Sequence, residues 1–566
     1  MIKRLETILF LLSFFALECL SQNADKDDFL RDAVRQSGQA RITIPFTGVR
    51  QLNYLSDKIS VSSVHEKSIE IVISPLTIDW FLSQNLNYEI TERIDRKSVK
   101  TASDISQAME WESYPSYTQY DSIMQSFRSL YPLLCDVDTI GRSINGKLIL
   151  VLKISDNVAA DEDETETFYT SSIHGDETAG YILMLRLADY LLKNYNSSSR
   201  VRNLVDNLEI WINPLANPDG TYRTGNTISS PTRFNANGYD LNRNFPDPVT
   251  PNTIKQKETL SMVEFLRERR FTLSANFHSG AEVVNFPWDS NWWPHADDDW
   301  FYNISRKYAD TVHLYAPGGY MTFMYNGVTN GYEWYQINGG RQDFVTRELQ
   351  GREVTIELHD DYVTPESQLN SLWQYNYRSL LGYLENALYG IHGYIKDRET
   401  GKPVPAKIFI TGHDKDSSHI YSDTLTGRYT RMLAPGTYDL NITSKGYIGK
   451  QIDDVIVYEG QAITLNVEMV PFINPVDTTD TPGLIVYPNP SADYFTLVLP
   501  QRQFGNITLT IFNSMGMKMS EYSAESVEDI PLRIDVSALK GGIYILQVRN
   551  RSSKMTDRAR IVVVRR

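Results

Sequence analysis

The sequence predicts an α/β protein whose main domain has a largely parallel or mixed sheet, with a small α+β domain before it and two small β-sandwich domains after it. Strand-like and helix-like segments alternate from residue 106 to residue 389, which is typical of helices layered on a sheet. Short strands separated by turn residues dominate after residue 390. At about 150 residues per domain, the 566 residues suggest three to four units.

The N-terminus is typical of an export signal. Lys3 and Arg4 precede an apolar run at residues 8–17, and small residues follow at Cys19 and Ser21. A membrane anchor would need roughly 20 apolar residues to cross a bilayer. We therefore expect a signal peptide at residues 1–21, with a lipid on Cys19 as the alternative.

Composition narrows the possible partners. A net charge of −15 argues against a protein that binds nucleic acid through its phosphates, and no later segment reaches transmembrane length. We expect no nucleic-acid partner and no membrane span. The chain without its signal peptide would keep only Cys135, so it can form no internal disulfide and must rely on hydrophobic cores.

Residues 22–105 are expected to form the small N-terminal domain. Runs rich in β-branched residues, ARITIPF at 40–46 and IEIVISP at 69–75, surround a helix-like stretch, and a charged, Ser-rich linker follows. Only its position before the main domain suggests that this leader is a pro-segment.

Residues 106–389 are expected to form the α/β domain, in which functional sites gather at strand ends. The predicted helices span residues 116–131, 179–195 and 259–270, and the predicted strands span residues 147–155, 166–173, 207–215, 272–278 and 353–358. Two β-sandwiches are expected at residues 390–471 and 484–566, joined by a linker at 472–483 with sequence FINPVDTTDTPG.

Two imidazoles and two carboxylates gather at predicted strand ends. His174 and Glu177 lie between a strand and a helix, where one turn can aim both at an ion, although such a pair is more often a solvated loop. His278 ends the strand LSANFH, and Glu357 lies near the end of EVTIEL, where an unpaired carboxylate would be costly to bury. Two imidazoles and one glutamate would leave zinc a fourth position for water, which indicates a hydrolytic site with Glu357 as general base.

The stretch GYDLNRNFPD adds a second polar group. Asp240 would accept the second N–H of His174 and fix its tautomer. Asn242 and Arg243 suit a clamp on a carboxylate. A polar turn with a surface arginine is the alternative.

Several motifs in a common order resemble the zinc metallocarboxypeptidases, specifically the regulatory branch that contains carboxypeptidases N, E, D and M. They are HGDE at 174–177, NPDG at 217–220, RFNANGYDLNRNFP, NFHSGAEVVNFPWD and NGYEWYQINGGRQDF. The resemblance covers roughly residues 109–470. It implies a mixed-sheet metallocarboxypeptidase domain at 106–389, followed by a transthyretin-like β-sandwich at 390–471.

The resemblance also implies a cofactor and its ligands. One Zn²⁺ per catalytic domain would be held by His174, Glu177 and His278. Glu357 would activate water, and Arg233 would stabilise the oxyanion of the tetrahedral intermediate.

For the substrate, the resemblance implies that Asn242 and Arg243 hold the terminal carboxylate and that Tyr335 caps the bound peptide. Asp289 matches the aspartate that pairs with a C-terminal Arg or Lys, and Gln342 lies where the pocket glutamine does. A neutral side chain would leave a buried Asp289 unpaired, which explains such a preference physically; the alternative is that Asp289 caps a turn.

The sequence departs from the pattern of this branch in two places. Ser279 replaces a usual glycine, and Ser290 stands where a second aspartate is common. The aromatic, acidic run NWWPHADDDW could also alter the pocket rim, so these departures bear on specificity more than on catalysis.

The C-terminal residues resemble the sorting domain of bacterial type IX secretion substrates. The matching motifs are VYPNPSADYFTLVL, SALKGGIYILQV and a basic end, RARIVVVRR. This resemblance implies contact with the type IX secretion machinery of a Gram-negative bacterium and a secreted or cell-surface product; a plain adhesive sandwich is the alternative.

Together these features predict a secreted, zinc-dependent exopeptidase that hydrolyses the C-terminal peptide bond of peptides or proteins ending in Lys or Arg. One alternative is a hydrolase of cell-wall peptides or other amides on the same zinc scaffold. Another is a non-catalytic, peptide-binding surface protein.

Overall fold

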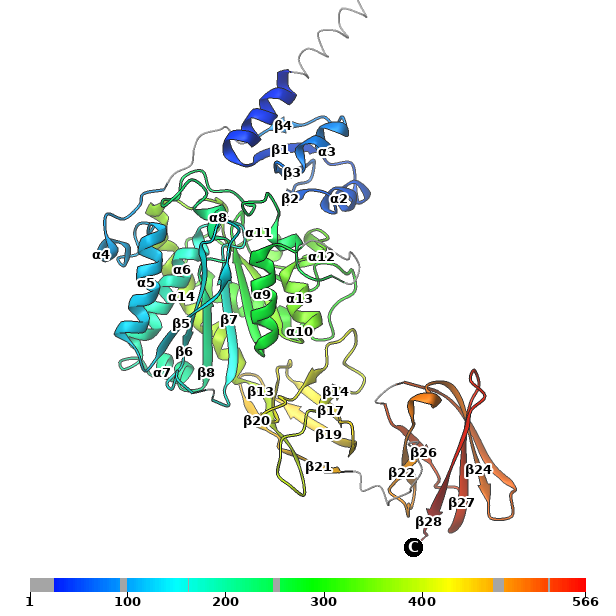
Figure 1. The fold of residues 1–566 in the computed structure, drawn as a ribbon. Helices are drawn as coiled ribbons and strands as arrows, with labels where there is room; N and C mark the ends of the chain where they lie inside the picture. The colour runs from blue at the N-terminus through cyan, green and yellow to red at the C-terminus, as the bar shows by residue number, and fades with distance from the viewer. Residues whose placement is uncertain are drawn as a thin grey trace, which may run out of the picture.

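The computed structural model describes residues 25–91, 99–160, 162–247, 255–471, 483–527 and 530–565. The expected signal peptide and nearly all of the expected linker at 472–483 lie outside these residues. Along the chain there follow a small α+β part, a large α/β part and two β parts (Figure 1). Within the described ranges, every helix is too short or too polar to cross a membrane.

The N-terminal part, residues 25–91, has an antiparallel four-stranded sheet in the order β2-β3-β1-β4. Its elements are a helix at 25–37, β1 (Ala40–Pro45), α2 (Val49–Ser56), β2 (Ser60–Val64), β3 (Ser68–Ile73), α3 (Ile78–Ser83) and β4 (Glu89–Ile90). Ile42 and Ile71 form part of its core, which also contains Tyr335 from the α/β part. The two parts are therefore in direct contact.

The α/β part is built on an eight-stranded mixed sheet in the order β11-β10-β12-β9-β7-β8-β6-β5. Its strands are β5 (Cys135–Arg142), β6 (Leu148–Ile154), β7 (Thr165–Ser171), β8 (Leu208–Asn213), β9 (Leu273–His278), β10 (Ala281–Phe286), β11 (Val328–Asn330) and β12 (Arg352–His359). The central block β12-β9-β7-β8 is parallel, whereas β6 and β10 pair with it in the antiparallel direction. The predicted mixed sheet is confirmed.

Helices cover both faces of this sheet (Figure 1). One face carries α5 (Tyr117–Leu130), α6 (Ala179–Asn194), α7 (Ser199–Val205), α10 (Asp298–His313) and α14 (Leu369–Glu385), and the other carries α9 (Lys257–Glu268) and α13 (Arg341–Glu348). Short helices lie in the connections: α4 (Ile105–Ala108), α8 (Pro218–Thr221), α11 (Phe323–Gly327) and α12 (Gly331–Trp334). Residues 99–104 also pack here, because Ala102 belongs to the core of the α/β part.

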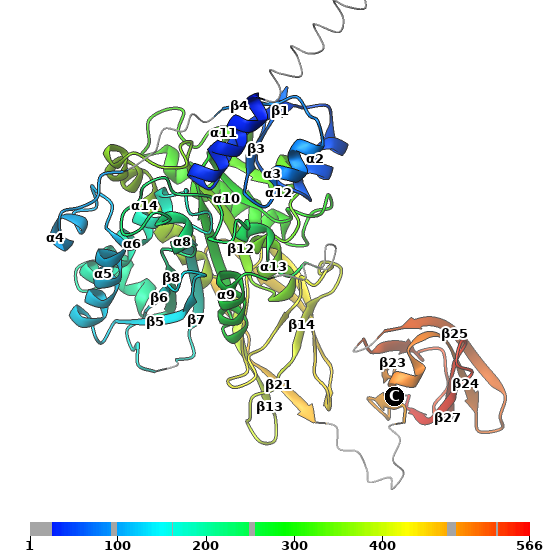
Figure 2. The same cartoon turned by 45° about the horizontal axis from the view of Figure 1, so that its top comes forward.

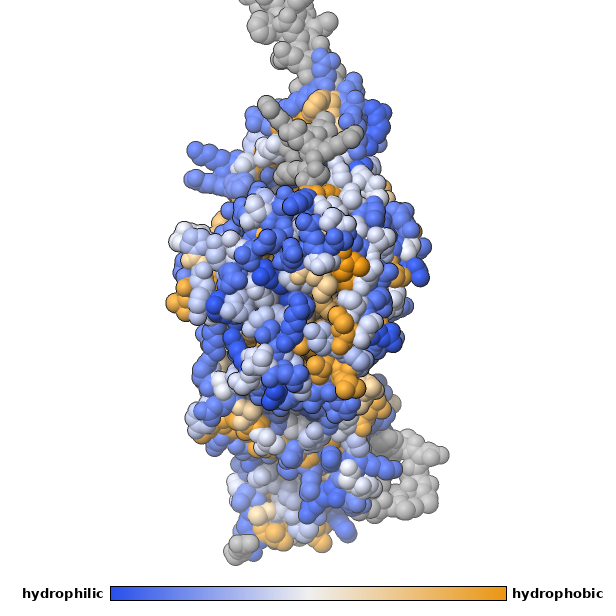
Figure 3. All heavy atoms as spheres, turned by 90° about the vertical axis from the view of Figure 1, so that its left-hand side faces the viewer, coloured by the Kyte–Doolittle hydropathy of each residue, from blue (hydrophilic) through white to orange (hydrophobic). Residues whose placement is uncertain are grey.

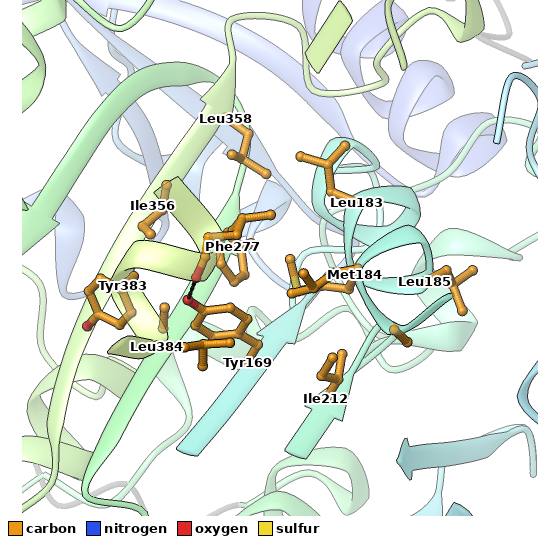
Figure 4. Packing of buried hydrophobic residues seen from close by; sticks show 14 of the residues in the cluster. Tyr169, Leu183, Met184, Leu185, Ile212, Phe277, Ile356, Leu358, Tyr383 and Leu384 are labelled. Carbon is orange, nitrogen blue, oxygen red and sulfur yellow. Dashed lines mark hydrogen bonds between the residues drawn. The ribbon is translucent and has the colours of Figure 1, made fainter. Parts of the chain in front are cut away.

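Neighbouring residues of the central strands belong to two different hydrophobic cores, one on each face of the sheet. Phe168 packs with α9 and α13, whereas the next residue, Tyr169, packs with α6 and α14. This alternation follows from the two-residue period of a strand. Figure 4 shows the second core, in which Tyr169, Phe277 and Met184 lie between the strands and α6.

The three predicted helices correspond to α5, α6 and α9, and the five predicted strands to β6, β7, β8, β9 and β12. The sequence reasoning missed α10 and α14, although Trp300, Ile304 and Tyr308 show the helical spacing of buried residues in α10. It also missed β10 and the two edge strands of the sheet, β11 and β5.

Two β parts follow, each with its own hydrophobic core. The first contains β13 (Gly390–Asp397), β14 (Lys407–Ile410), β15 (Ile420–Tyr421), β16 (Arg428–Arg431), β17 (Gly436–Thr443), β18 (Tyr447–Ile448), β19 (Lys450–Val457), β20 (Ala462–Thr464) and β21 (Val467–Pro471). The second contains β22 (Ile485–Tyr487), β23 (Tyr494–Val498), β24 (Gly505–Asn513), β25 (Lys518–Ser526), β26 (Leu532–Asp535), β27 (Gly542–Asn550) and β28 (Thr556–Val563). Each part consists of two sheets.

The surface is mixed in character on the side that faces left in Figure 1. Figure 3 shows that hydrophilic residues dominate there and that apolar residues form small separate groups among them. Such scattered apolar residues are normal on a water-exposed surface and need no partner.

Candidate active site

The predicted site residues lie at the carboxyl ends of the central parallel strands. His174 follows β7, and His278 is the last residue of β9. Glu357, on β12, lies beside His278 in the register of the two strands. Parallel strands end at one edge of a sheet, and this edge is where α/β folds place their sites.

His174, Glu177 and His278 converge on one buried point. The Glu177 carboxylate lies 2.8 Å from His174 Nδ1 through one oxygen and 2.7 Å from His278 Nδ1 through the other. The two Nδ1 atoms are 3.1 Å apart. The ligand atoms of the three residues all lie within 4.8 Å of one another.

Each imidazole also has a contact at its second ring nitrogen, Nε2. Asp240 Oδ1 lies 3.0 Å from His174 Nε2, and the Asn276 side-chain amide lies 2.7 Å from His278 Nε2. Such contacts fix the ring orientation, and a carboxylate at Nε2, as in His174, keeps the ring proton there and leaves the lone pair of Nδ1 for a metal. Asn276 precedes His278 by two residues, so both side chains lie on the same face of β9.

This donor set fits zinc. Two imidazole nitrogens and one carboxylate, all buried, are a common protein ligand set for a catalytic zinc ion. The pKa of Glu177 lies well below its usual range, because the charges of His174 and His278 outweigh the effect of burial. The carboxylate is thus ionised, as a metal ligand must be.

Glu357 is a half-buried residue next to this set. Its Oε2 atom has no hydrogen-bond partner among the described residues. Glu357 lines a cavity that His174, Glu177 and His278 also line. Burial and then the charge of Glu177 raise the pKa of Glu357 well above its usual range, against the opposing charge of Arg233. A carboxyl group with a raised pKa is suited to exchange protons near neutral pH.

Arg233 lies between the metal-ligand set and Asp240. Its guanidinium donates to Glu177 Oε1 over 3.2 Å and to Asp240 Oδ2 over 3.0 Å. Asn242 and Arg243 follow in a 3-10 turn, Leu241–Arg243. The side-chain oxygen of Asn242 accepts the N–H of Arg341 over 2.9 Å, which orients its amide.

Asp289 is buried and held by amide groups. Its Oδ1 accepts hydrogen bonds from Gln342 Nε2 over 3.0 Å and from Asn285 Nδ2 over 3.1 Å. Burial and then the charge of Asp343 raise the pKa of Asp289 well above its usual range. A side chain on Gly331 would place its Cβ 1.8 Å from Asp289 Oδ1, so only glycine leaves room there.

The backbone around Asp289 is fixed by Asp343. One oxygen of Asp343 accepts the N–H of Asp289 over 3.0 Å, and the other accepts the N–H of Ser290 over 2.9 Å. Asp343 directly follows Gln342 on α13. Neighbouring residues of one helix thus hold the carboxylate and the backbone of Asp289.

One cavity joins most of these groups. Nearly all of the predicted site residues line it: His174, Glu177, Arg233, Asn242, Arg243, His278, Asp289, Tyr335 and Glu357. Gln342 and Asp240 are not among the lining residues and contact Asp289 and His174 respectively. The site therefore combines a candidate metal-ligand set, the carboxyl group of Glu357, two arginines and the carboxyl group of Asp289.

The chain is similar to known proteins. Residues 120–379 match the zinc carboxypeptidase family. Mouse Carboxypeptidase M is 32% identical over 58% of this chain and 77% of its own, and the mouse Carboxypeptidase N catalytic chain is 31% identical over 59% and 82%. The chain belongs to the zinc carboxypeptidase family. Human Carboxypeptidase D is 32% identical over 62% of this chain, which spans only 26% of that protein's length.

A second match concerns the C-terminal end of the chain. Residues 485–563 match the secretion system C-terminal sorting domain. The resemblances to the regulatory branch and to the sorting domain are thus confirmed. The sorting domain supports a secreted or cell-surface location.

Several residues that shape this candidate site were missed by the sequence reasoning. Asn276 could have been found from its two-residue spacing to His278, and Asn285 and Asp343 from their nearness to Asp289 and Gln342. The contacts that residues 25–91 make with the site, such as the ion pair of Arg41 with Asp176, have no such local signal in the sequence.

Proposed function

We propose that this protein is a zinc-dependent exopeptidase that removes C-terminal Lys or Arg from peptides and proteins. The observation that carries this proposal is a single cavity lined by the metal-ligand set, Glu357, Arg243 and Asp289. A hydrolytic centre would thus lie beside one cationic and one anionic side chain. This charge pattern complements a peptide end that carries an α-carboxylate and a cationic side chain.

Arg243 and Asn242 would bind the terminal carboxylate. A guanidinium matches a carboxylate in a planar, two-point contact. The Asn242 oxygen is already bonded to the backbone of Arg341, so its amide N–H groups are left to donate. Because only a chain end carries this carboxylate, these residues would restrict cleavage to the last peptide bond.

Asp289 would pair with the cationic side chain. It is buried, and its Oδ1 is the shared acceptor of Asn285 and Gln342. A neutral substrate side chain would leave this carboxyl group without a charged partner, and such a loss is costly in a buried site. The preference for Lys or Arg follows from that difference.

Zinc held by His174, Glu177 and His278 would polarise the scissile carbonyl and lower the pKa of water. Glu357 would accept the proton of the attacking water and return it to the leaving amine. The Arg233 guanidinium would stabilise the negative charge that develops on the carbonyl oxygen. Tyr335 lines the cavity and would close over bound peptide.

We also propose the route by which the protein leaves the cell. The signal peptide at 1–21 would direct the chain across the inner membrane of a Gram-negative bacterium. The C-terminal sorting domain would then engage the type IX secretion machinery.

The test compares hydrolysis rates on blocked dipeptides that end in Arg, Lys, Leu, Glu or diaminopimelate, with and without a chelator. We expect one zinc ion per chain, cleavage of the Arg and Lys substrates, and loss of activity on chelation. The variant Glu357→Gln should lower kcat by about 10²- to 10⁴-fold while the zinc content stays unchanged.

Matched aspartate variants test the specificity. Asp289→Asn should remove the preference for Arg and Lys, whereas Asp299→Asn, at an exposed position outside the cavity, should not. A preference for diaminopimelate would instead favour a cell-wall peptidase. Binding of peptides without any cleavage would favour a non-catalytic binder.

A further inference from the structure

The NPDG motif at 217–220 has no part in the proposed chemistry, yet it contacts the backbone of two segments of the candidate site. Asn217 lies between β8 and α8, and Figures 1 and 2 show α8 at the end of the sheet nearer to the N-terminal part. Its side chain is fully buried and is not among the groups that line the cavity. Asn217 can therefore affect a substrate only through other residues.

The Asn217 amide joins two segments of the site. Its Nδ2 atom donates one hydrogen bond to the carbonyl of Ile173 over 3.2 Å and another to the carbonyl of Arg233 over 3.3 Å. Ile173 directly precedes the candidate metal ligand His174. A side-chain amide has two N–H groups, and both are used here. One side chain thus connects the metal-ligand loop to the residue that would stabilise the oxyanion.

The same side chain is also held at its oxygen. Oδ1 of Asn217 accepts the N–H of Gly220 over 3.0 Å, and the backbone N–H of Asn217 donates to the carbonyl of Ser172 over 3.0 Å. If the amide were flipped, its oxygen would face two carbonyl oxygens and its N–H groups would face an N–H. The hydrogen-bond partners therefore fix the orientation of the amide.

Two glycines let these segments pack backbone to backbone. A Cβ on Gly175 would lie 2.3 Å from the carbonyl carbon of Gly220, and a Cβ on Gly220 would lie 2.7 Å from Asn217 Nδ2. The N–H of Gly175 donates to the same Arg233 carbonyl over 3.3 Å. Because backbone meets backbone here, a shift of the Asn217 amide would move the segments that carry His174 and Arg233.

The motif itself is anchored to the sheet by Asp219. Its Oδ1 pairs with the Lys147 ammonium over 2.9 Å, and its Oδ2 accepts the N–H of Asn145 over 2.8 Å. Both partners lie in the connection between β5 and β6. The buried carboxylate thus has a partner at each oxygen, which holds residues 217–220 in place against the site.

We propose that Asn217 is a positioning residue that sets the spacing between His174 and the Arg233 guanidinium. The proposal rests on the proposed hydrolase function. The guanidinium acts on charge that develops only in the transition state, so its misplacement slows the chemical step. A misplacement of about 1 Å can cost about 10²-fold in rate. The residues that would bind the terminal carboxylate lie in a separate turn, Leu241–Arg243, so substrate binding changes little.

The first test replaces the amide by a carboxylate of the same shape. Asn217→Asp places oxygens opposite the carbonyls of Ile173 and Arg233. On a blocked dipeptide ending in Arg, kcat should fall about 10- to 100-fold, whereas KM should change by no more than about twofold. The zinc content per chain should stay unchanged. Asn207→Asp is the matched control, because Asn207 is exposed and donates to the carbonyl of Asn203.

A variant cycle separates positioning from general stability. In an Arg233→Ala background there is no guanidinium to position, so Asn217→Asp should lower kcat by no more than about threefold further. A general loss of stability would lower kcat by the same factor in both backgrounds. Asn217→Ser keeps one O–H donor for the two carbonyls and should cause an intermediate fall in kcat, which answers the same question if the aspartate variant does not fold.

A binding measurement makes the test independent of turnover. The probe is a phosphonate analogue of the blocked dipeptide, whose tetrahedral group carries the negative charge of the transition state. Free arginine, which has only the carboxylate and side chain of the product, is the reference. By calorimetry, Asn217→Asp should weaken phosphonate binding by about tenfold or more and arginine binding by no more than about twofold.

The outcomes separate the positioning role from the hydrolase function. Equal kcat values for Asn217→Asp and the unaltered protein overturn the positioning role, and so does an equal fall in kcat with and without the Arg233 guanidinium. Loss of zinc from the variant also overturns it, because Asn217 would then support metal binding itself. An unaltered protein that binds the phosphonate but cleaves no peptide refutes the hydrolase, and weaker phosphonate binding by the variant then still supports the positioning role. Neither binding nor cleavage by the unaltered protein refutes both.

Discussion

The α/β part has two buried ionic interfaces, one on either side, and they differ in how completely their carboxylates are paired. Toward the first β part, Asp297 accepts hydrogen bonds from Arg431 over 2.7 and 2.9 Å, from Arg352 over 2.8 Å and from His413 over 2.7 Å. Toward the N-terminal part, Asp176 has one arginine and one glutamine on a single oxygen. Its other oxygen has no hydrogen-bond partner among the described residues.

This difference suggests different uses. Asp297 does not line the cavity, and its network saturates both oxygens, which suits a permanent joint. Asp176 lies next to the metal ligands and is incompletely satisfied, so water could replace its partners at lower cost. At the interface that touches the site, the buried carboxylate is therefore the less completely paired of the two.

The largest expected effect is on stability, at the interface that Asp297 forms with the first β part. Asp297→Ala would leave Arg431 and Arg352 buried without their shared carboxylate, which should lower the free energy of unfolding by about 3–5 kcal/mol. Denaturant unfolding measures this loss. Asp299→Ala, at an exposed neighbouring position, should change it by no more than about 0.5 kcal/mol. A similar small effect for both variants would remove the contrast between the two interfaces.

The second expected effect is local to the other interface. Arg41→Ala should weaken the attachment of the N-terminal part by about 1.5–3 kcal/mol, since it removes a charged hydrogen bond to Asp176. Hydrogen exchange should show lost amide protection in β2 and unchanged protection in β16. Loss of protection in both strands would mean that Arg41 supports the whole fold.

A smaller effect concerns the part of the cavity that contains Asp289. Asp343→Asn keeps the shape of the side chain but places N–H donors opposite the N–H of Asp289 or Ser290. We expect the preference for Arg over Leu, as a ratio of kcat/KM values, to fall about tenfold, which corresponds to about 1.4 kcal/mol. If Asp343 serves only stability, the melting temperature will fall and the ratio will stay the same.

The smallest expected effect is a pH dependence of the same ratio. The pKa of Asp289 is raised by burial and by the charge of Asp343, so the carboxyl group stays protonated to a higher pH than an ordinary aspartate. Because only the ionised form pairs with a cation, the preference for Arg over Leu should increase with pH and then level off. Asp343→Asn should shift this rise to lower pH, and Asp289→Asn should abolish it. A flat profile in the unaltered protein would show that Asp289 does not select the substrate.

The local chemistry of the site could be predicted from the sequence. The spacing of His174 and Glu177 after an apolar strand, the strand that ends in His278 and the position of Glu357 near the end of another strand all follow local patterns. Period-two alternation and helical spacing indicate which residues share a face of a strand or helix. The order of the motifs along the chain indicates the family.

Tertiary structure alone decided which distant residues meet. Arg41 and Asp176 are 135 residues apart, and Tyr335 contacts Val61 across 274. Such contacts depend on how separately folded parts pack together, and periodicity within a short segment carries no information about that packing. The sequence therefore determined a candidate metal-ligand set at the end of a mixed sheet, whereas only the fold decided that the first part of the chain would lie beside it.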